Sequence, residues 1–231
     1  GDVGWQAEWI AAADPAISAP LLRREITLRK SVQRVTAYVA GVGYFELSIN
    51  GQKAGDHVLD PGTSYYHHDQ DFPLRSRVLY VVHDVTHLWQ DATNAVGIVL
   101  GNGWYSAEAD IPGSPHHRQP YADRPCVRLQ LEFAFSDGSR QRIGTDANWK
   151  TSAGPVTYND YSHGETYDAR REQPGWQRAG FDATSWEPAV TVEGPNGRLV
   201  PQMMEPIRVM ETLHPLRVLS PKPGVRIYDM G

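Results

Sequence analysis

The chain has 231 residues, of which 40% are hydrophobic and 21% charged, and its formal net charge is −5. This is the composition of a globular protein with a buried core and not of a disordered chain. The negative balance, with no Lys/Arg run interleaved with aromatic residues, argues against a nucleic-acid partner. No apolar run approaches the roughly 20 residues needed to cross a membrane. The single cysteine, Cys126, excludes an internal disulfide and favours a small core residue.

The first part of the chain reads as short strands. Residues 22–28 alternate loosely between polar and apolar and predict a first strand. Residues 35–42 predict a second strand, which ends in the Gly41–Gly43 region.

A hairpin follows at residues 43–62. Residues 44–49 alternate with period two, as in a strand with one buried face. Asn50 and Gly51 tolerate positive φ and predict a tight turn, after which Lys53 begins a return strand. The return strand leads into a polar loop, so the sequence predicts a buried hairpin with an oxygen-rich exit.

Two apolar runs and a glycine turn come next. Residues 78–82 and 95–100 are short continuous apolar runs, which suit strands covered on both faces. Between them, residues 84–89 predict one helical turn capped by Asp84. The second run leads into the sequence GNGWY at 101–105.

A long loop separates this region from the clearest strand pattern. Residues 106–125 contain four prolines and a His pair, have no periodicity and predict a long surface loop. Residues 127–135 then alternate strictly, residues 136–139 predict a turn, and residues 141–143 predict the returning strand.

Many short strands and few helical segments predict an all-β fold, an antiparallel β-sandwich of the jelly-roll or galactose-binding-like type. The GPNG sequence at 194–197 predicts a domain boundary. We therefore divide the chain into an N-terminal lead at 1–21, a sandwich at 22–193, and a linker with the start of a second β-domain at 194–231.

Seven stretches spread over nearly the whole chain carry a family pattern. They are AEWI at 7–10, LRREITL at 22–28, YFELSINGQKAGDHVLDPGTSYY at 44–66, HDVTHL at 83–88, NAVGIVLGNGWY at 94–105, GETYDAR at 164–170 and PGW at 174–176. In combination they resemble the N-terminal, non-catalytic part of bacterial α-L-rhamnosidases. The resemblance implies a glycoside hydrolase that removes terminal L-rhamnose. Its catalytic (α/α)6 barrel lies downstream, so no catalytic residue is expected in this chain.

The resemblance places the 56–62 loop and the 101–105 turn together at one end of the sandwich. In some relatives the equivalent sandwich binds rhamnose through a calcium ion, an ion that takes about 6–8 oxygen ligands. Carboxylate and amide oxygens make Asp56 and Asn102 candidate calcium ligands. The candidate sugar-binding residues are Asp56, Asp60, Asn102, Trp104 and Tyr105, with the rings stacking on the sugar.

The alternative is that Asp56 and Asn102 are turn residues that bond their own backbone. His57 also counts against calcium, because a hard cation prefers oxygen ligands.

A second polar cluster consists of Asn159, Asp160, Glu165, Asp168 and Arg170. Two carboxylates at short spacing suggest a glycosidase acid and base, but that chemistry needs a cleft and a raised pKa. The favoured interpretation is structural or interdomain: Asp168 pairs with Arg170 or Arg171, and Glu165 caps a turn or contacts the next domain.

Three functions stay open. The chain is an accessory region that holds a rhamnose-containing glycan near a catalytic domain of the same protein, a ligand-free scaffold for that domain, or an enzyme in its own right. Other chemistry has no motif, because GxSxG, GxGxxG and GxxxxGK[ST] are absent and the His pairs at 67–68 and 116–117 lack HExxH or CxxC companions.

Overall fold

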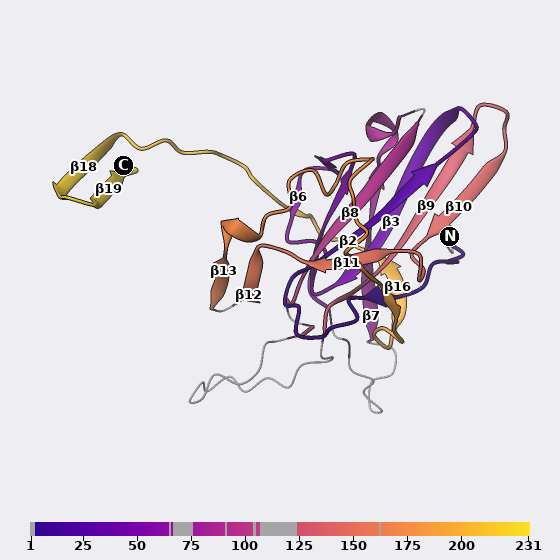
Figure 1. Cartoon of the computed structure of the whole chain (residues 1–231), viewed down its shortest axis with the longest axis horizontal. Coiled ribbons are helices and arrows are strands. Elements are labelled where there is room, and N and C mark those ends of the chain that lie inside the picture. The colour runs from indigo at the N-terminus through magenta and orange to yellow at the C-terminus, as the bar shows by residue number, and fades with distance from the viewer. Residues whose placement is uncertain are drawn as a thin grey trace.

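The computed structural model describes residues 3–64, 66, 76–90, 92–103, 105–106, 124–161 and 163–231. Within these ranges the regular structure is almost entirely strand, with two short 3-10 helices, η1 (Thr86–Leu88) and η2 (Ala169–Arg171). No helix among the described residues has the length and apolar character that a membrane span requires. The predicted all-β sandwich is confirmed (Figure 1).

Two sheets form the sandwich. The seven-stranded sheet has the order β15 (Val190–Thr191), β1 (Ile10–Ala11), β9 (Cys126–Phe135), β3 (Val32–Val42), β7 (Arg77–Asp84) and β16 (Arg198–Pro201), and β10 (Arg140–Gly144) also pairs with β9. The six-stranded sheet has the order β14 (Glu187–Pro188), β11 (Lys150–Ala153), β2 (Pro20–Thr27), β8 (Thr93–Gly101), β4 (Tyr44–Ile49) and β5 (Gln52–Lys53). All these pairs are antiparallel except β16 with β7.

Three two-stranded ladders complete the fold. They are β12 (Val156–Asp160) with β13 (Gly164–Tyr167), β17 (Ile207–Arg208) with β6 (His57–Val58), and β18 (Arg217–Lys222) with β19 (Val225–Asp229). The β18–β19 hairpin lies apart from both sheets, at the end of an extended segment (Figure 1).

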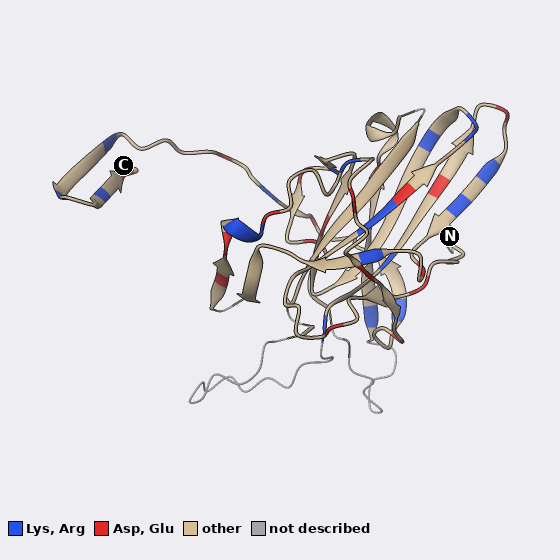
Figure 2. Ribbon diagram, in the orientation of Figure 1, with Lys and Arg blue, Asp and Glu red and all other residues tan. Residues whose placement is uncertain are grey.

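The core lies between the two sheets, and the strand patterns explain it. The alternating residues of β9 place Leu129, Leu131 and Phe133 on the inner face, each about 1% exposed. Trp89 packs edge-to-face on Phe133, with ring centroids 4.9 Å apart. On the outer face, Arg142 of β10 pairs with Glu132 of β9, so charges of both signs share this surface (Figure 2).

The predicted hairpin is present. Asn50 (φ +53°) and Gly51 (φ +81°) form the turn between β4 and β5. The Asn50 side chain also donates to the Leu88 carbonyl at 3.0 Å and accepts from the Ala95 amide at 2.9 Å. The turn residue therefore ties the hairpin to η1 and β8. The helical turn is present as η1, but its N-cap is Val85 and not the predicted Asp84; the Asp84 side chain, one residue earlier, accepts from the Thr86 amide.

Strand pairing crosses both predicted domain limits. β1 lies before residue 22 and pairs with β9 and β15. β16 and β17 lie after residue 194 and pair with β7 and β6. Most of the predicted surface loop at 106–125 lies outside the described residues, as do both His pairs and Trp104.

Gly43 joins the two sheets, because the chain passes there from β3 to β4. Its φ is +87°, and a Cβ at this position would lie 1.9 Å from the Gly101 carbonyl oxygen. Only glycine fits, and its close approach sets the start of β4 against the turn that follows β8.

Gly43→Ala is expected to lower the free energy of unfolding by about 3 kcal/mol or more, because the added methyl group overlaps backbone that cannot move away. Gly138→Ala is the matched control: φ is +80° there, but no heavy atom lies within 4 Å of an added Cβ. The free energy of unfolding of the control should fall by only about 1–2 kcal/mol, because alanine disfavours the left-handed backbone conformation. Urea unfolding measures both, and equal losses would contradict the packing argument.

Candidate functional site

A pocket of about 300 Å³ opens at the end of the sandwich where the predicted loops meet. Four segments form it: the start of β4, the loop after β6, the turn after β8, and the β12–β13 hairpin. The lining residues whose side chains matter most are Tyr44, Glu46, Leu59, Asn159, Asp160, Tyr161 and Glu165. We call this the end pocket. It brings residues of the second polar cluster beside the loop and the turn of the first candidate site.

The end pocket joins aromatic and apolar walls to carboxylates. Burial raises the pKa of the Tyr44 phenol, and the nearby Tyr161 hydroxyl raises it further. Tyr161 is 44% exposed and Leu59 53% exposed, so both present apolar surface to solvent. The Asp160 carboxylate binds Nδ1 of His163 at 2.9 Å. Such a surface suits a small polyhydroxylated ligand that has one apolar face.

Leu59 adopts a backbone conformation that residues other than glycine rarely take. Its φ is +56°. Among the described residues, the other positive φ angles belong to Asn50 and to glycines. The left-handed region costs a branched residue roughly 1–2 kcal/mol, and such strain concentrates at binding sites. The structure thus holds a large apolar side chain at the rim of the end pocket against its backbone preference.

A buried hydrogen-bond network supports the pocket from behind. The Asn159 side chain accepts from the Asn102 amide at 2.7 Å and donates to the Ser18 hydroxyl at 2.6 Å. The Asn102 side chain donates to the Asn159 carbonyl at 3.1 Å and accepts from the Ser106 hydroxyl at 3.0 Å. Asn102 is only 4% exposed. Its side chain therefore holds the hairpin against the turn through a partner 57 residues away, and not through its own backbone.

Asp56 belongs to a different network. Its carboxylate accepts from Nε of Arg208 at 2.9 Å, and this hydrogen bond holds the pKa of Asp56 below its usual range. Because Asp56 pairs with a guanidinium and Asn102 lies in the buried network, their oxygens do not fit a shared calcium shell. The calcium assignment stays a prediction that these contacts do not favour.

The described aromatic residue of the GNGWY turn is a core residue. Tyr105 is 4% exposed, and its ring packs edge-to-face on Tyr66 with centroids 5.3 Å apart. Beside it, burial raises the pKa of the Cys126 thiol, although a hydrogen bond with Tyr105 acts in the opposite direction. Tyr105 thus stabilises the turn. Stacking on a bound sugar would fall to other rings, those of the end pocket.

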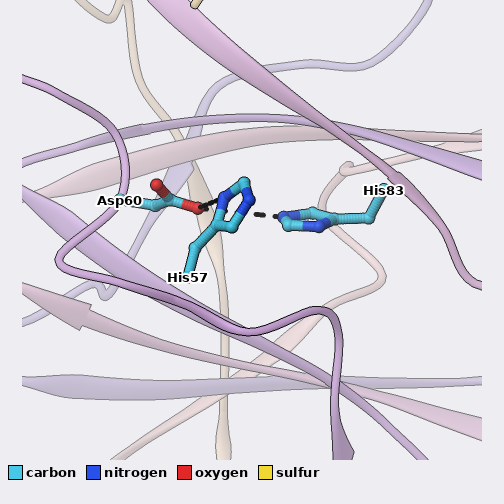
Figure 3. A group of neighbouring side chains, drawn as sticks. All are labelled: His57, Asp60 and His83. Carbon is cyan, nitrogen blue, oxygen red and sulfur yellow. Dashed lines mark hydrogen bonds and ion pairs between the residues drawn. The ribbon is translucent and has the colours of Figure 1, made fainter. Parts of the chain in front are cut away.

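The Asp60 carboxylate contacts two histidines, His57 and His83 (Figure 3). His57 Nδ1 is 2.8 Å from Asp60 Oδ2, and Nε2 of His83 is 3.9 Å from the same oxygen. Asp60 is 5% exposed and His83 is 7% exposed. Burial, more than any neighbouring charge, lowers the pKa of His83. The carboxylate that we predicted for sugar binding is therefore occupied by protein partners.

The second polar cluster divides in two. Asn159, Asp160 and Glu165 line the end pocket. Asp168 instead accepts from Nε of Arg170 at 2.8 Å and from the Arg170 amide at 3.1 Å, which caps η2. This pair matches the structural interpretation of Asp168.

Sequence reasoning missed four of these pocket residues: Tyr44, Glu46, Leu59 and Tyr161. Tyr161 stands in a polar and aromatic stretch that carried a usable signal. Tyr44 and Leu59 carry no local signal, because only strand pairing over long sequence separations brings them together.

Comparisons with known proteins identify the family of this chain. Residues 30–211 match the Alpha-L-rhamnosidase N-terminal domain family. An alpha-L-rhamnosidase of Streptomyces avermitilis is 34% identical over 245 residues, covering 100% of this chain and 22% of that protein. A solved alpha-L-rhamnosidase from Dictyoglumus thermophilum superposes with a TM-score of 0.82 at 35% identity, covering 98% of this chain and 25% of that one. The chain therefore belongs to the α-L-rhamnosidase N-terminal domain family, and the resemblance is confirmed.

A further solved structure is a Streptomyces avermitilis alpha-L-rhamnosidase complexed with L-rhamnose. It superposes with a TM-score of 0.78 at 34% identity, covering 92% of this chain and 20% of that one. The chain spans only about a fifth to a quarter of the length of these relatives.

Asn159→Ala is expected to lower the free energy of unfolding by about 2–4 kcal/mol, because it removes the acceptor of the buried Asn102 amide and the side-chain donor to the Ser18 carbonyl. Asn148→Ala is the matched control, since the Asn148 side chain is exposed and donates to Asp146 at 3.1 Å. The control should change stability by about 0.5 kcal/mol or less. Thermal and urea unfolding measure both, and a similar loss in the two variants would contradict a supporting role for the network.

Proposed function

We propose that this chain is an accessory region of an α-L-rhamnosidase and that the end pocket holds an L-rhamnosyl unit of the glycoside. The observation that carries the proposal is the pocket itself, where Tyr161 and Leu59 face solvent beside Asp160 and Glu165. The complex of the Streptomyces avermitilis relative with L-rhamnose supports the sugar class, although it concerns that protein and not this chain.

The chemistry of the sugar fits the pocket walls. L-Rhamnose is a 6-deoxy sugar, so it has a methyl group and an apolar C–H face as well as hydroxyl groups. The Tyr161 ring and Leu59 would contact the apolar side, and the carboxylates would accept hydrogen bonds from the hydroxyl groups. The bound sugar would stay close to the catalytic region of the same protein, which raises the local substrate concentration.

Hydrolysis itself is assigned to that catalytic region. Glycoside hydrolysis needs two carboxyl groups that flank the scissile bond, one of them with a raised pKa. The hydrogen bond from Arg170 lowers the pKa of Asp168, which is the opposite of what a general acid requires. The role proposed for this region is therefore binding.

Methyl α-L-rhamnoside is expected to bind the chain with a Kd on the order of 1 mM. This corresponds to a binding free energy of about −0.3 kcal/mol for each heavy atom of the ligand. Tyr161→Ala should weaken binding about fivefold or more, because it removes the exposed ring. Leu59→Gly should weaken binding while thermal stability stays the same or rises, since glycine accepts the left-handed backbone. NMR titration measures affinity, and thermal unfolding measures stability.

Tyr167→Ala is the control for the ring. Tyr167 belongs to the same hairpin, is 51% exposed and does not line the pocket. Affinity that survives both Tyr161→Ala and Leu59→Gly, or the lack of any saturable binding to the unmodified chain, would refute the pocket as a rhamnose site.

A second function, docking onto the catalytic region, is favoured by a separate observation. Large apolar side chains are exposed throughout residues 203–230, including Met203 (93%), Met210 (88%) and Leu216 (78%). Large apolar side chains exposed in such number along one segment mark an interaction site. We propose that this segment packs against the remainder of the same polypeptide, which in the relatives makes up most of the length.

Hydrogen exchange tests the docking proposal. The backbone amides of residues 203–230 are expected to exchange rapidly in the 231-residue chain and slowly when the catalytic region is joined to it. The amides of β9 are the internal control, because the core protects them in both proteins. Equal exchange of residues 203–230 in the two proteins would leave scaffold docking without support.

A further inference from the structure

Three potential metal ligands converge outside the end pocket. His57 and Asp60 come from the loop that leaves the hairpin, and His83 comes from β7. The ligating atoms of these three residues lie within 4.8 Å of one another. Figure 3 shows both imidazole rings directed toward the Asp60 carboxylate from two different segments.

The spacing of the donor atoms is close to that of a metal shell. Ligands about 2.0–2.1 Å from a tetrahedral ion lie roughly 3.4 Å apart. Asp60 Oδ2 is 2.8 Å from His57 Nδ1 and 3.9 Å from His83 Nε2, so the two distances bracket that value. Small side-chain rotations would make the three atoms equidistant from an ion.

The local packing preorganises this group. The side chains of Asp60 and His83 are only 6% and 7% exposed, whereas His57 is 17% exposed and gives a route to solvent. Gly55 has φ +77°, and a Cβ there would lie 2.8 Å from His83 Nδ1, so a glycine makes room for the ring. Two of the three ligands are thus held in place before any ion arrives.

We propose that His57, Asp60 and His83 bind one divalent first-row transition-metal ion, and we take Zn²⁺ as the probe. Two imidazoles and one carboxylate with an open fourth position match the borderline-soft ions, Zn²⁺ among them. Calcium is disfavoured, because two of the three donors are nitrogen. The ion would tie the loop at residues 57–60 to β7 of the opposite sheet.

Arg208 makes the proposal more specific. Its Nη2 is 3.3 Å from His57 Nε2, and a guanidinium can only donate, so Nε2 carries no proton and Nδ1 carries it. When a metal binds Nδ1, the proton of that nitrogen goes to solvent and Nε2 takes one proton from solvent, so the ring stays neutral and no net proton is released. The contact with Arg208 must then break, and Asp56 Oδ1, which is 3.9 Å from Nε2, would have to move closer to accept from it.

Isothermal titration of the metal-stripped 231-residue chain with Zn²⁺ tests the site. We expect one strong site per chain, and Co²⁺ substitution should give the visible absorption of a low-coordinate site. His83→Gln and His57→Gln should each weaken binding about 100-fold or more, since ligand loss exceeds the 10–100-fold cost of losing an outer partner. Circular dichroism confirms that the variants fold.

His163→Gln is the matched control. His163 makes the same kind of contact, with Nδ1 2.9 Å from an Asp160 oxygen three residues away, but among the described residues no second histidine is grouped with that pair. It should leave the strong site unchanged. Binding that His83→Gln and His163→Gln change equally, or only weak binding spread over several surface histidines, would overturn the proposal.

Arg208→Met gives an independent readout. Because Arg208 competes for His57 Nε2, its removal should strengthen Zn²⁺ binding about tenfold. Unchanged or weaker binding would overturn coordination through Nδ1. The readout contains no sugar, so its failure is distinct from a failure of the end pocket to bind rhamnose.

Discussion

The first two residues of β4 hold the functional end of the sandwich together. Tyr44 pairs with Gly101, and the Phe45 amide donates to the Asp60 carbonyl at 2.8 Å. One strand start therefore fixes the turn after β8 on one side and the hairpin exit loop on the other. The arrangement depends on the missing side chain of Gly43, whose backbone lies against Gly101. Both the end pocket and the histidine cluster are built on these loops.

The sequence predicted the parts of this structure that depend on local pattern. Period-two alternation identified β9, and Asn50-Gly51 identified the turn between β4 and β5, because side-chain direction and turn geometry are set by neighbouring residues. The family resemblance identified which loops belong at one end.

Long-range contacts could not be predicted in the same way. Asn102 and Asn159 are 57 residues apart, and each reads as a polar loop residue until strand pairing brings them together. The role of Asp56 likewise depends on Arg208, 152 residues away and beyond the domain limit that we predicted at residue 194. A motif names the residue type, but the partner decides whether its oxygen is available to a ligand.

The loop between His57 and Asp60 links the two proposed sites through Leu59. His57 and Asp60 point inward to His83, while Leu59 between them points to the end pocket in a strained left-handed conformation. Between these two inward side chains the chain turns at Leu59, whose φ of +56° lies in the left-handed region. The hydrogen bond from His57 to Asp60 keeps Leu59 in that conformation. The proposed metal ion would act in the same way. The buried polar cluster and the exposed apolar rim are therefore two faces of one constrained loop.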